Sequence, residues 1–162
     1  MITVVSRVLF VCSGNICRSP IAEGVFRKKM DEQGLRDQFE VDSAATGRWH
    51  IGEAPDTRAR IVLEQHGAPV PKAARQVTKR DFEYFDYILA MDQGVANTLR
   101  RRAPSEAGAA KVALILDATA GGDVPDPYFG KQVDFEIAYD LLDAAVDRWI
   151  VLLGAKLPGR AG

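Results

Sequence analysis

The stretch Arg7-Val8-Leu9-Phe10-Val11-Cys12-Ser13-Gly14-Asn15-Ile16-Cys17-Arg18-Ser19-Pro20 decides the fold of this chain. Its apolar first part, Arg7–Val11, predicts a buried strand, and Pro20 with the residues after it predicts the start of a helix. A strand, a tight loop and a helix N-terminus form an anion cradle, because the N–H groups of the loop and first turn have no partner within the helix. Cys12 at the strand end is a nucleophile and Arg18 at the helix start is a cation, so the stretch predicts chemistry on a bound phosphate.

The residue types in this loop suit phosphoryl transfer. A helix N-terminus and a nearby cation favour the thiolate form of a cysteine, which is a strong nucleophile, and the Ser19 hydroxyl is a further donor to Cys12. The planar guanidinium of Arg18 can bind two phosphoryl oxygens at once, while loop N–H groups meet the oxygens that carry transition-state charge. Gly14 leaves room for the ligand, and Asn15 tolerates a left-handed conformation. The expected phosphate-binding loop residues are Ser13, Gly14, Asn15, Ile16, Cys17 and Ser19.

The run C-x5-R-S at the end of the first strand resembles the signature of the low-molecular-weight protein tyrosine phosphatases. The resemblance extends from Arg7 to Leu153 and includes, in order, Val41–Gly47, Ala74–Thr78, Phe85–Asp92 and Asp126–Gly130. It implies a phosphatase that hydrolyses phosphotyrosine and small aryl phosphates through a cysteinyl-phosphate, without a cofactor. It also implies a parallel sheet with strand order 2-1-3-4, phosphotyrosine proteins as substrates, and phosphate or similar oxyanions as product or inhibitor.

A late loop carries the expected acid. The departure of a phenol needs a proton at the bridging oxygen, and a loop aspartate can donate it and then activate water. The resemblance assigns this double role to Asp126, which Pro127 restricts to extended conformations. Tyr128 and Phe129 are expected to wall the pocket, with Trp49 opposite them. A deep slot lined by aromatic rings favours phosphotyrosine over the shorter phosphoserine.

Two residues near the loop leave alternatives open. Cys17 either fills space or forms a reversible disulfide with Cys12 that protects an oxidised nucleophile, and the resemblance supports the disulfide. Many relatives place a histidine just upstream of the Ala-Arg-Gln segment, where it bonds Ser43 and supports the loop. This chain has Lys72 at or near that position, so the network through Asn15, Ser19 and Ser43 must differ.

Composition indicates one globular domain. The chain has 162 residues, 47% hydrophobic and 27% charged, with a formal net charge of −1, so we expect neither nucleic acid nor a membrane as partner. Two cysteines are too few for a disulfide scaffold, and Met1–Arg7 does not read as a signal peptide. We therefore expect the cytoplasm, or export without a signal peptide. His50 and His66 lie in no metal-ligand pattern, so no metal is expected.

The order of elements predicts an α/β, three-layer doubly wound fold with helices on both faces of a four-stranded parallel sheet. Because ligands in such folds bind beyond the carboxyl ends of the strands, Cys12 falls at the expected place. The phosphatase core covers about 7–153, and 154–162 form a flexible tail, with Lys156–Gly162 frayed. Expected strands are Arg7–Cys12, Glu40–Ala44, Tyr87–Met91 and Val112–Leu116; expected helices are Pro20–Gln33, Asp56–His66, Phe82–Phe85, Asp92–Arg102 and Asp134–Leu153.

Three other functions share the fold or the loop. A thioredoxin-coupled arsenate reductase needs further cysteines downstream, and none follows Cys17. Protein-arginine phosphatases tend to carry Thr in place of Ile16 and Phe in place of Tyr128, and a bulky Ile16 leaves less room for a guanidinium leaving group. A phosphopeptide-binding module without catalysis needs neither a nucleophile nor an acid.

Overall fold

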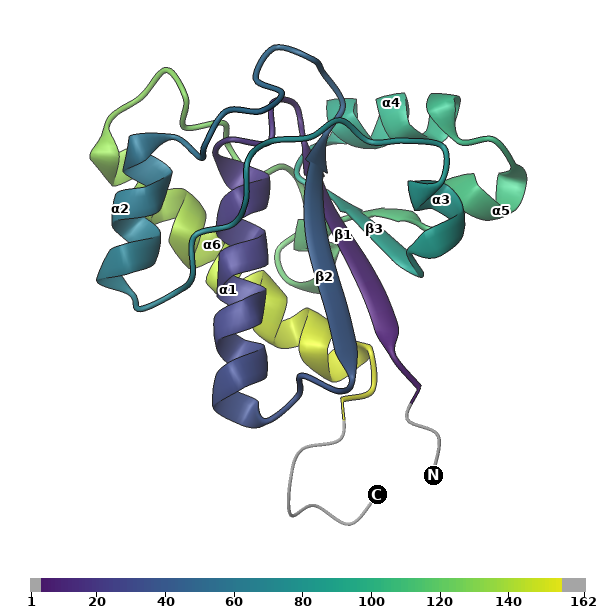
Figure 1. Cartoon of the computed structure of the whole chain (residues 1–162), viewed down its shortest axis with the longest axis horizontal. Helices are drawn as coiled ribbons and strands as arrows, with labels where there is room; N and C mark the ends of the chain where they lie inside the picture. Colours follow the sequence, from purple (N-terminus) through teal and green to yellow (C-terminus); the bar gives the residue numbers. More distant parts are fainter. Residues whose placement is uncertain (1–3, 156–162) are drawn as a thin grey trace.

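The computed structural model describes residues 4–155, which form a parallel sheet with the order β2-β1-β3-β4 (Figure 1). This confirms the strand order that the family resemblance implied. The strands are β1 (Ser6–Cys12), β2 (Phe39–Ala45), β3 (Tyr87–Ala90) and β4 (Val112–Leu114). The predicted Lys156–Gly162 tail lies outside the described residues.

The fourth strand is shorter than the sequence predicted. Ile115 and Leu116, expected to extend β4, lie instead in the 3-10 helix η1 (Ile115–Ala118). The Asp117 carboxylate accepts the Leu114 N–H at 3.2 Å and so turns the chain at the strand end. Both residues remain buried, and burial is the property that their apolar character had signalled.

The helices begin and end at recognisable signals. Asp56 accepts the Arg58 N–H at the start of α2, as the sequence indicated, and Gly34 ends α1 in the left-handed conformation with φ 68°. The short α5 was not predicted; Ser105 caps it, but its Ala-Gly composition carries no apolar period. The helices are α1 (Arg18–Gln33), α2 (Thr57–Gln65), α3 (Asp81–Tyr84), α4 (Gln93–Arg102), α5 (Glu106–Ala109) and α6 (Gln132–Leu152).

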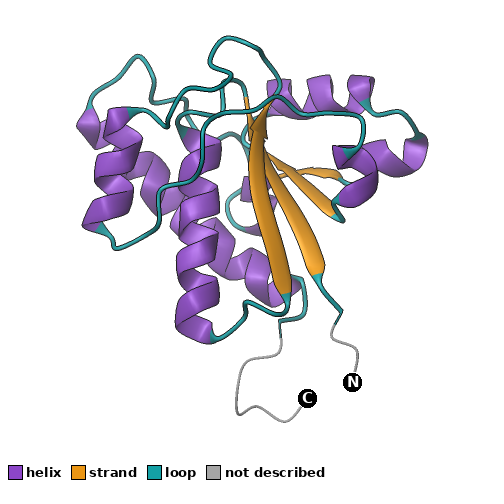
Figure 2. Cartoon of the chain, in the orientation of Figure 1, coloured by secondary structure: helices purple, strands orange, loops and turns teal. Residues whose placement is uncertain are grey.

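Helices cover both faces of the sheet, which confirms the three-layer architecture (Figure 2). Alternate residues of β1 enter two separate cores. Val8 and Phe10 pack in the cluster that α1, α2 and α6 complete, while Leu9 and Val11 pack in the cluster that α3 and α4 complete. Because both faces are covered, the central strands β1 and β3 are nearly continuous runs of apolar residues.

Loops from distant parts of the chain meet at the carboxyl ends of the strands. The Cys12 carbonyl accepts the Thr46 N–H at 3.0 Å, which ties the end of β1 to the loop after β2. On the other side the Val11 carbonyl accepts the Met91 N–H, and the Met91 carbonyl accepts the Val124 N–H. These bonds bring the segments around residues 12, 46, 91 and 124 to one end of the sheet.

Candidate active site

The loop between β1 and α1 wraps around the Cys12 sulfur. Asn15 has φ 56°, the left-handed conformation that the sequence analysis expected it to tolerate. This turn directs the Asn15 N–H to Cys12 Sγ at 3.2 Å. Gly14 has a neighbour that sequence reasoning missed, because a Cβ there would lie 2.9 Å from the His50 ring.

A chain of buried polar side chains supports the loop. Ser19 Oγ lies 3.0 Å from Cys12 Sγ, and the Asn15 amide nitrogen donates to Ser19 Oγ at 2.8 Å and to Ser43 Oγ at 3.0 Å. The sequence predicts a network through Asn15, Ser19 and Ser43, and the structure brings these residues together. The chain continues to a residue that this prediction had missed, since Ser43 Oγ donates to Glu23 Oε1 at 2.7 Å. Lys72 is exposed, whereas Glu23 is buried at the end of the network.

Arg18 is buried beside the loop and held by two acceptors. Its Nη1 donates to Asp92 Oδ2 and to the Val124 carbonyl, both at 2.8 Å. Its Nη2 lies 3.8 Å from Asp126 Oδ2. Asp92 had been assigned only to a helix start, and it does cap α4 by accepting the Val95 N–H. The two carboxylate oxygens of Asp92 therefore serve two purposes, the helix cap and the orientation of the guanidinium.

The late loop that carries the expected acid lies next to the phosphate-binding loop, because Asp126 Oδ2 is 3.8 Å from Arg18 Nη2. Asp126 has a half-exposed side chain, and its Oδ1 accepts the Tyr128 N–H at 3.1 Å. Arg58, which the sequence analysis did not single out, donates to the carbonyls of Tyr128 and Gly130 at 2.9 Å each. Arg58 is itself held by Asp56, and this hydrogen bond lowers the pKa of the Asp56 carboxyl. The start of α2 thus anchors the acid loop.

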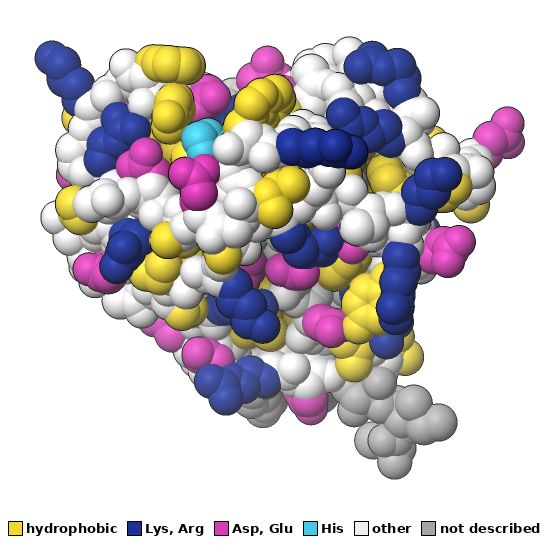
Figure 3. Space-filling model, turned by 45° about the horizontal axis from the view of Figure 1, so that its top comes forward, with side chains coloured by type: hydrophobic (Ala, Val, Ile, Leu, Met, Phe, Trp, Pro, Cys, Tyr) yellow, Lys and Arg dark blue, Asp and Glu magenta, His cyan; other side chains and the backbone are white. Residues whose placement is uncertain are grey.

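The expected aromatic walls differ in their exposure. Tyr128 is 37% exposed and has its ring centroid 5.9 Å from that of His50. Phe129 is 93% exposed and packs edge-on against Tyr128, while Trp49 is 73% exposed and lies against Gly47. Figure 3, in which the loop end of the sheet is turned forward, shows hydrophobic and basic side chains side by side there. Tyr128 is the most enclosed of the three expected walls.

Both cysteines are buried free thiols. Burial raises the pKa of the Cys17 thiol far above its ordinary value, and the negative charge of Asp56 raises it further. Cys17 is therefore protonated at neutral pH. Because the thiolate is the form that attacks, Cys17 is not a competing nucleophile in the resting loop.

Residues 4–155 contain neither a cluster that could bind a metal nor a helix that could span a membrane. No three His, Cys, Asp or Glu side chains in this range are placed to hold a metal ion. None of the helices described is both long and apolar enough to cross a lipid bilayer.

The chain is similar to known proteins both in sequence and in fold. The family model described as low molecular weight phosphotyrosine protein phosphatase matches residues 7–158. A low molecular weight protein-tyrosine-phosphatase of Streptomyces coelicolor is 46% identical over 160 residues, covering 96% of this chain and 98% of the relative. The crystal structure of a protein tyrosine phosphatase from Entamoeba histolytica with Hepes in the active site matches with a TM-score of 0.87 and 38% identity, over 91% of this chain and 96% of that one. A structure named drosophila arginine phosphatase matches with a TM-score of 0.86 and 30% identity, over 92% of this chain and 98% of that one.

Proposed function

The chain belongs to the low molecular weight phosphotyrosine protein phosphatase family and is a protein-tyrosine-phosphatase, and on this basis we propose that Cys12, Arg18 and Asp126 are its catalytic residues. The observation that carries the proposal is the 3.8 Å separation of Arg18 Nη2 and Asp126 Oδ2. At this distance the carboxyl group of Asp126, the proposed proton donor, lies next to the loop that holds Cys12 and Arg18. Such a set performs phosphoryl transfer from an aryl ester.

In the first step Cys12 Sγ attacks phosphorus and the bond to the phenolic oxygen breaks. Arg18 and the loop N–H groups hold the phosphoryl oxygens, on which charge is spread in the transition state. Asp92 and the Val124 carbonyl orient the guanidinium before substrate arrives. Protonated Asp126 gives its proton to the departing oxygen, so the phenol leaves neutral.

In the second step water hydrolyses the cysteinyl-phosphate. Asp126, now a carboxylate, takes a proton from the water as the water oxygen attacks phosphorus. The sulfur–phosphorus bond breaks, and the thiolate of Cys12 accepts a hydrogen bond from Ser19, whose oxygen lies 3.0 Å away. Inorganic phosphate is the product, and similar oxyanions are expected to inhibit by occupying the same loop.

The arginine-phosphatase alternative depends on the pocket and not on the fold, because a drosophila arginine phosphatase has the same fold. Ile16 is buried in the phosphate loop, and its apolar side chain leaves no polar group for a guanidinium. Tyr128 is part of the loop that carries Asp126, where its ring can pack on a phenol. Both residues favour phosphotyrosine in proteins as the substrate.

The proposal extends to the rest of the chain. We take the sequence as one phosphatase domain, which the family match over residues 7–158 supports. The cytoplasm is the proposed compartment, because a reactive thiol needs reducing conditions. The near-neutral charge supports protein substrates in preference to nucleic acid.

The test is turnover of a phosphotyrosine peptide beside a phosphoarginine protein, with a chelator present and Cys12→Ser as the blank. We expect rapid release of phosphate from phosphotyrosine that depends on Cys12 and is unaffected by the chelator. Preference for phosphoarginine would overturn the assignment of the pocket. Undiminished turnover by Cys12→Ser would overturn the mechanism.

A further inference from the structure

We propose that Glu23 is a positioning residue that sets the direction of the hydrogen bonds ending at the Cys12 sulfur. Glu23 lies on α1 and touches neither Cys12 nor the expected position of the substrate. It acts through Ser43, Asn15 and Ser19, each of which is within hydrogen-bond distance of the next. The inference rests on the proposed role of Cys12 as nucleophile.

The direction begins at the Asn15 amide, which has two fixed neighbours. The main-chain N–H of Arg75 donates to Asn15 Oδ1 at 3.1 Å, so the carbonyl oxygen of the amide must face Arg75. The amide nitrogen then faces Ser19 and Ser43 and donates one hydrogen to each hydroxyl. Reversing the amide would bring two donors together at Arg75.

The Ser43 hydroxyl has one hydrogen, and Glu23 determines where it goes. Because Ser43 Oγ accepts from Asn15, its own hydrogen needs a different acceptor, and Glu23 Oε1 lies 2.7 Å away. A carboxylate only accepts, so it holds this hydrogen away from Asn15. Without that acceptor, the Ser43 hydrogen would be free to turn toward the amide and compete with its donation.

The consequence appears at the nucleophile. Ser19 Oγ accepts from Asn15 at 2.8 Å, and Cys12 Sγ lies 3.0 Å from the same oxygen. Since Ser19 is fully buried, its hydrogen points to the sulfur, which favours a thiolate as acceptor. The Asn15 amide therefore donates to both sides, to Ser43 with Glu23 behind it and to Ser19 with Cys12 behind it, and this arrangement prepares the nucleophile before substrate binds.

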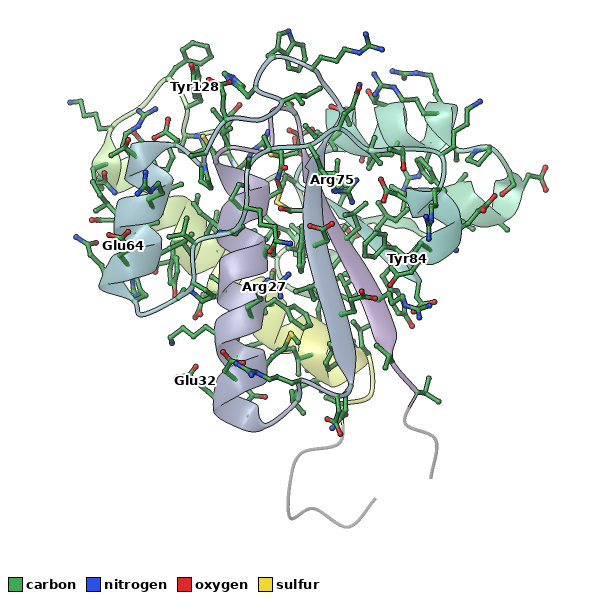
Figure 4. All side chains as sticks on the ribbon, viewed as in Figure 1. Arg27, Glu32, Glu64, Arg75, Tyr84 and Tyr128 are labelled. Carbon is green, nitrogen blue, oxygen red and sulfur yellow. The ribbon has the colours of Figure 1, made fainter. Side chains whose placement is uncertain are left out.

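Glu23 can play this part only as a carboxylate, because both of its oxygens accept. Arg27, one helical turn later, donates from Nε to Glu23 Oε2 at 2.8 Å and from Nη2 to the Val41 carbonyl at 2.8 Å. Figure 4 shows Arg27 on α1 next to β2, and Arg75 nearer the loop end. A groove of about 940 Å³ lies along this side of β2, and its lining includes Glu23, Arg27 and Ser43.

Replacing Glu23 with glutamine keeps the shape of the side chain but changes the direction of its hydrogen bond with Ser43. In Glu23→Gln the single amide oxygen is drawn to Arg27, and the NH2 group then faces Ser43 and donates to it. Ser43 would receive two donors and would have no acceptor for its own hydrogen. The double variant Glu23→Gln/Arg27→Met also lacks the Arg27 donor that attracts the amide oxygen. The glutamine amide can then turn, so that its oxygen again accepts from Ser43.

The experiment measures alkylation of Cys12 by iodoacetamide as a function of pH, together with kcat and KM for p-nitrophenyl phosphate. We expect Glu23→Gln to slow alkylation near pH 6 about tenfold, the effect of one misdirected hydrogen bond to a charged group. The double variant should recover most of this loss. Glu32→Gln is the matched control, because Glu32 is an exposed residue of the same helix, paired with Lys28. It should behave as wild type.

A merely structural role would leave Glu23→Gln, which has the same shape, at the wild-type rate, and that result would overturn the proposal. So would equal alkylation rates in Glu23→Gln and the double variant, if thermal unfolding shows both to be folded. The alkylation rate does not require turnover. Failure of the phosphatase assay with the expected alkylation pattern would therefore count against the proposed function alone.

Discussion

Asp92 offers the sharpest test of how the fold prepares the site. One oxygen of this carboxylate accepts from Arg18 at 2.8 Å, and the other caps α4 by accepting the Val95 N–H at 2.8 Å. Asp92→Ala removes both functions. Asp92→Asn keeps the cap, because asparagine is an equally good N-cap residue whose oxygen can accept the Val95 N–H, but its NH2 group then faces Arg18 and cannot accept from it.

The expected losses follow from these contacts. A hydrogen bond to a charged group contributes about 1.5–3 kcal/mol, and loss of an N-cap costs about 1 kcal/mol. Because the Asp92 side chain is 23% exposed, we expect Asp92→Ala to lower the free energy of unfolding by about 3 kcal/mol, in the middle of that combined range. Asp92→Asn should lower it by about 2 kcal/mol, since it keeps the cap but loses the hydrogen bond to the charged Arg18.

Urea unfolding measures these free energies, and inhibition by inorganic phosphate reports on Arg18 directly. With only the Val124 carbonyl left to orient the guanidinium, phosphate should bind about tenfold more weakly to Asp92→Ala, and kcat/KM should fall by up to about 100-fold. Asp92→Asn should have a free energy of unfolding between those of Asp92→Ala and wild type, but it should bind phosphate about as weakly as Asp92→Ala, because it also loses the acceptor for Arg18. Wild-type phosphate affinity in a destabilised Asp92→Ala would refute the orienting role and leave Asp92 as a helix cap only.

Two further predictions concern the acid loop and the second cysteine. Arg58→Ala releases the carbonyls of Tyr128 and Gly130, so it should slow aryl phosphates with poor leaving groups about tenfold more than those with good ones, in the pattern of Asp126→Ala; equal slowing of both classes would disconnect Arg58 from the acid. Burial raises the pKa of Cys17 above its ordinary 9.0, so the folded state keeps a proton that the unfolded state loses. The contribution of Cys17 to the free energy of unfolding is complete below pH 9.0 and falls above it by up to about 1.4 kcal/mol per pH unit. The free energy of unfolding measured in urea should therefore decline less steeply between pH 9 and 10 in Cys17→Ala than in wild type. An identical slope in both proteins would contradict the assignment.

Local sequence was enough to predict the fold class, and it also led to the proposed centre of the site. The apolar runs of the strands and the capping residues of the helices are short-range signals, and they located the main elements to within a few residues. The exceptions were η1 and α5, because Ile115 and Leu116 are apolar in either conformation and the Ala-Gly turn of α5 has no apolar face. Cys12 and Arg18 were recognised because they occupy one contiguous loop.

The sequence alone therefore predicted the phosphate-binding loop, and its family resemblance supplied the strand order, which the structure confirms, and the proposed acid Asp126. Only the tertiary structure decided which charged groups support these residues. Asp92 accepts from Arg18, Glu23 accepts from Ser43, and Arg58 donates to two carbonyls of the loop that carries Asp126. The physical reason is distance along the chain. Asp92 lies 74 residues from Arg18, and Arg58 lies 70 residues from Tyr128. Their pairing has no local pattern, because it arises only when the parallel strands bring their carboxyl ends together.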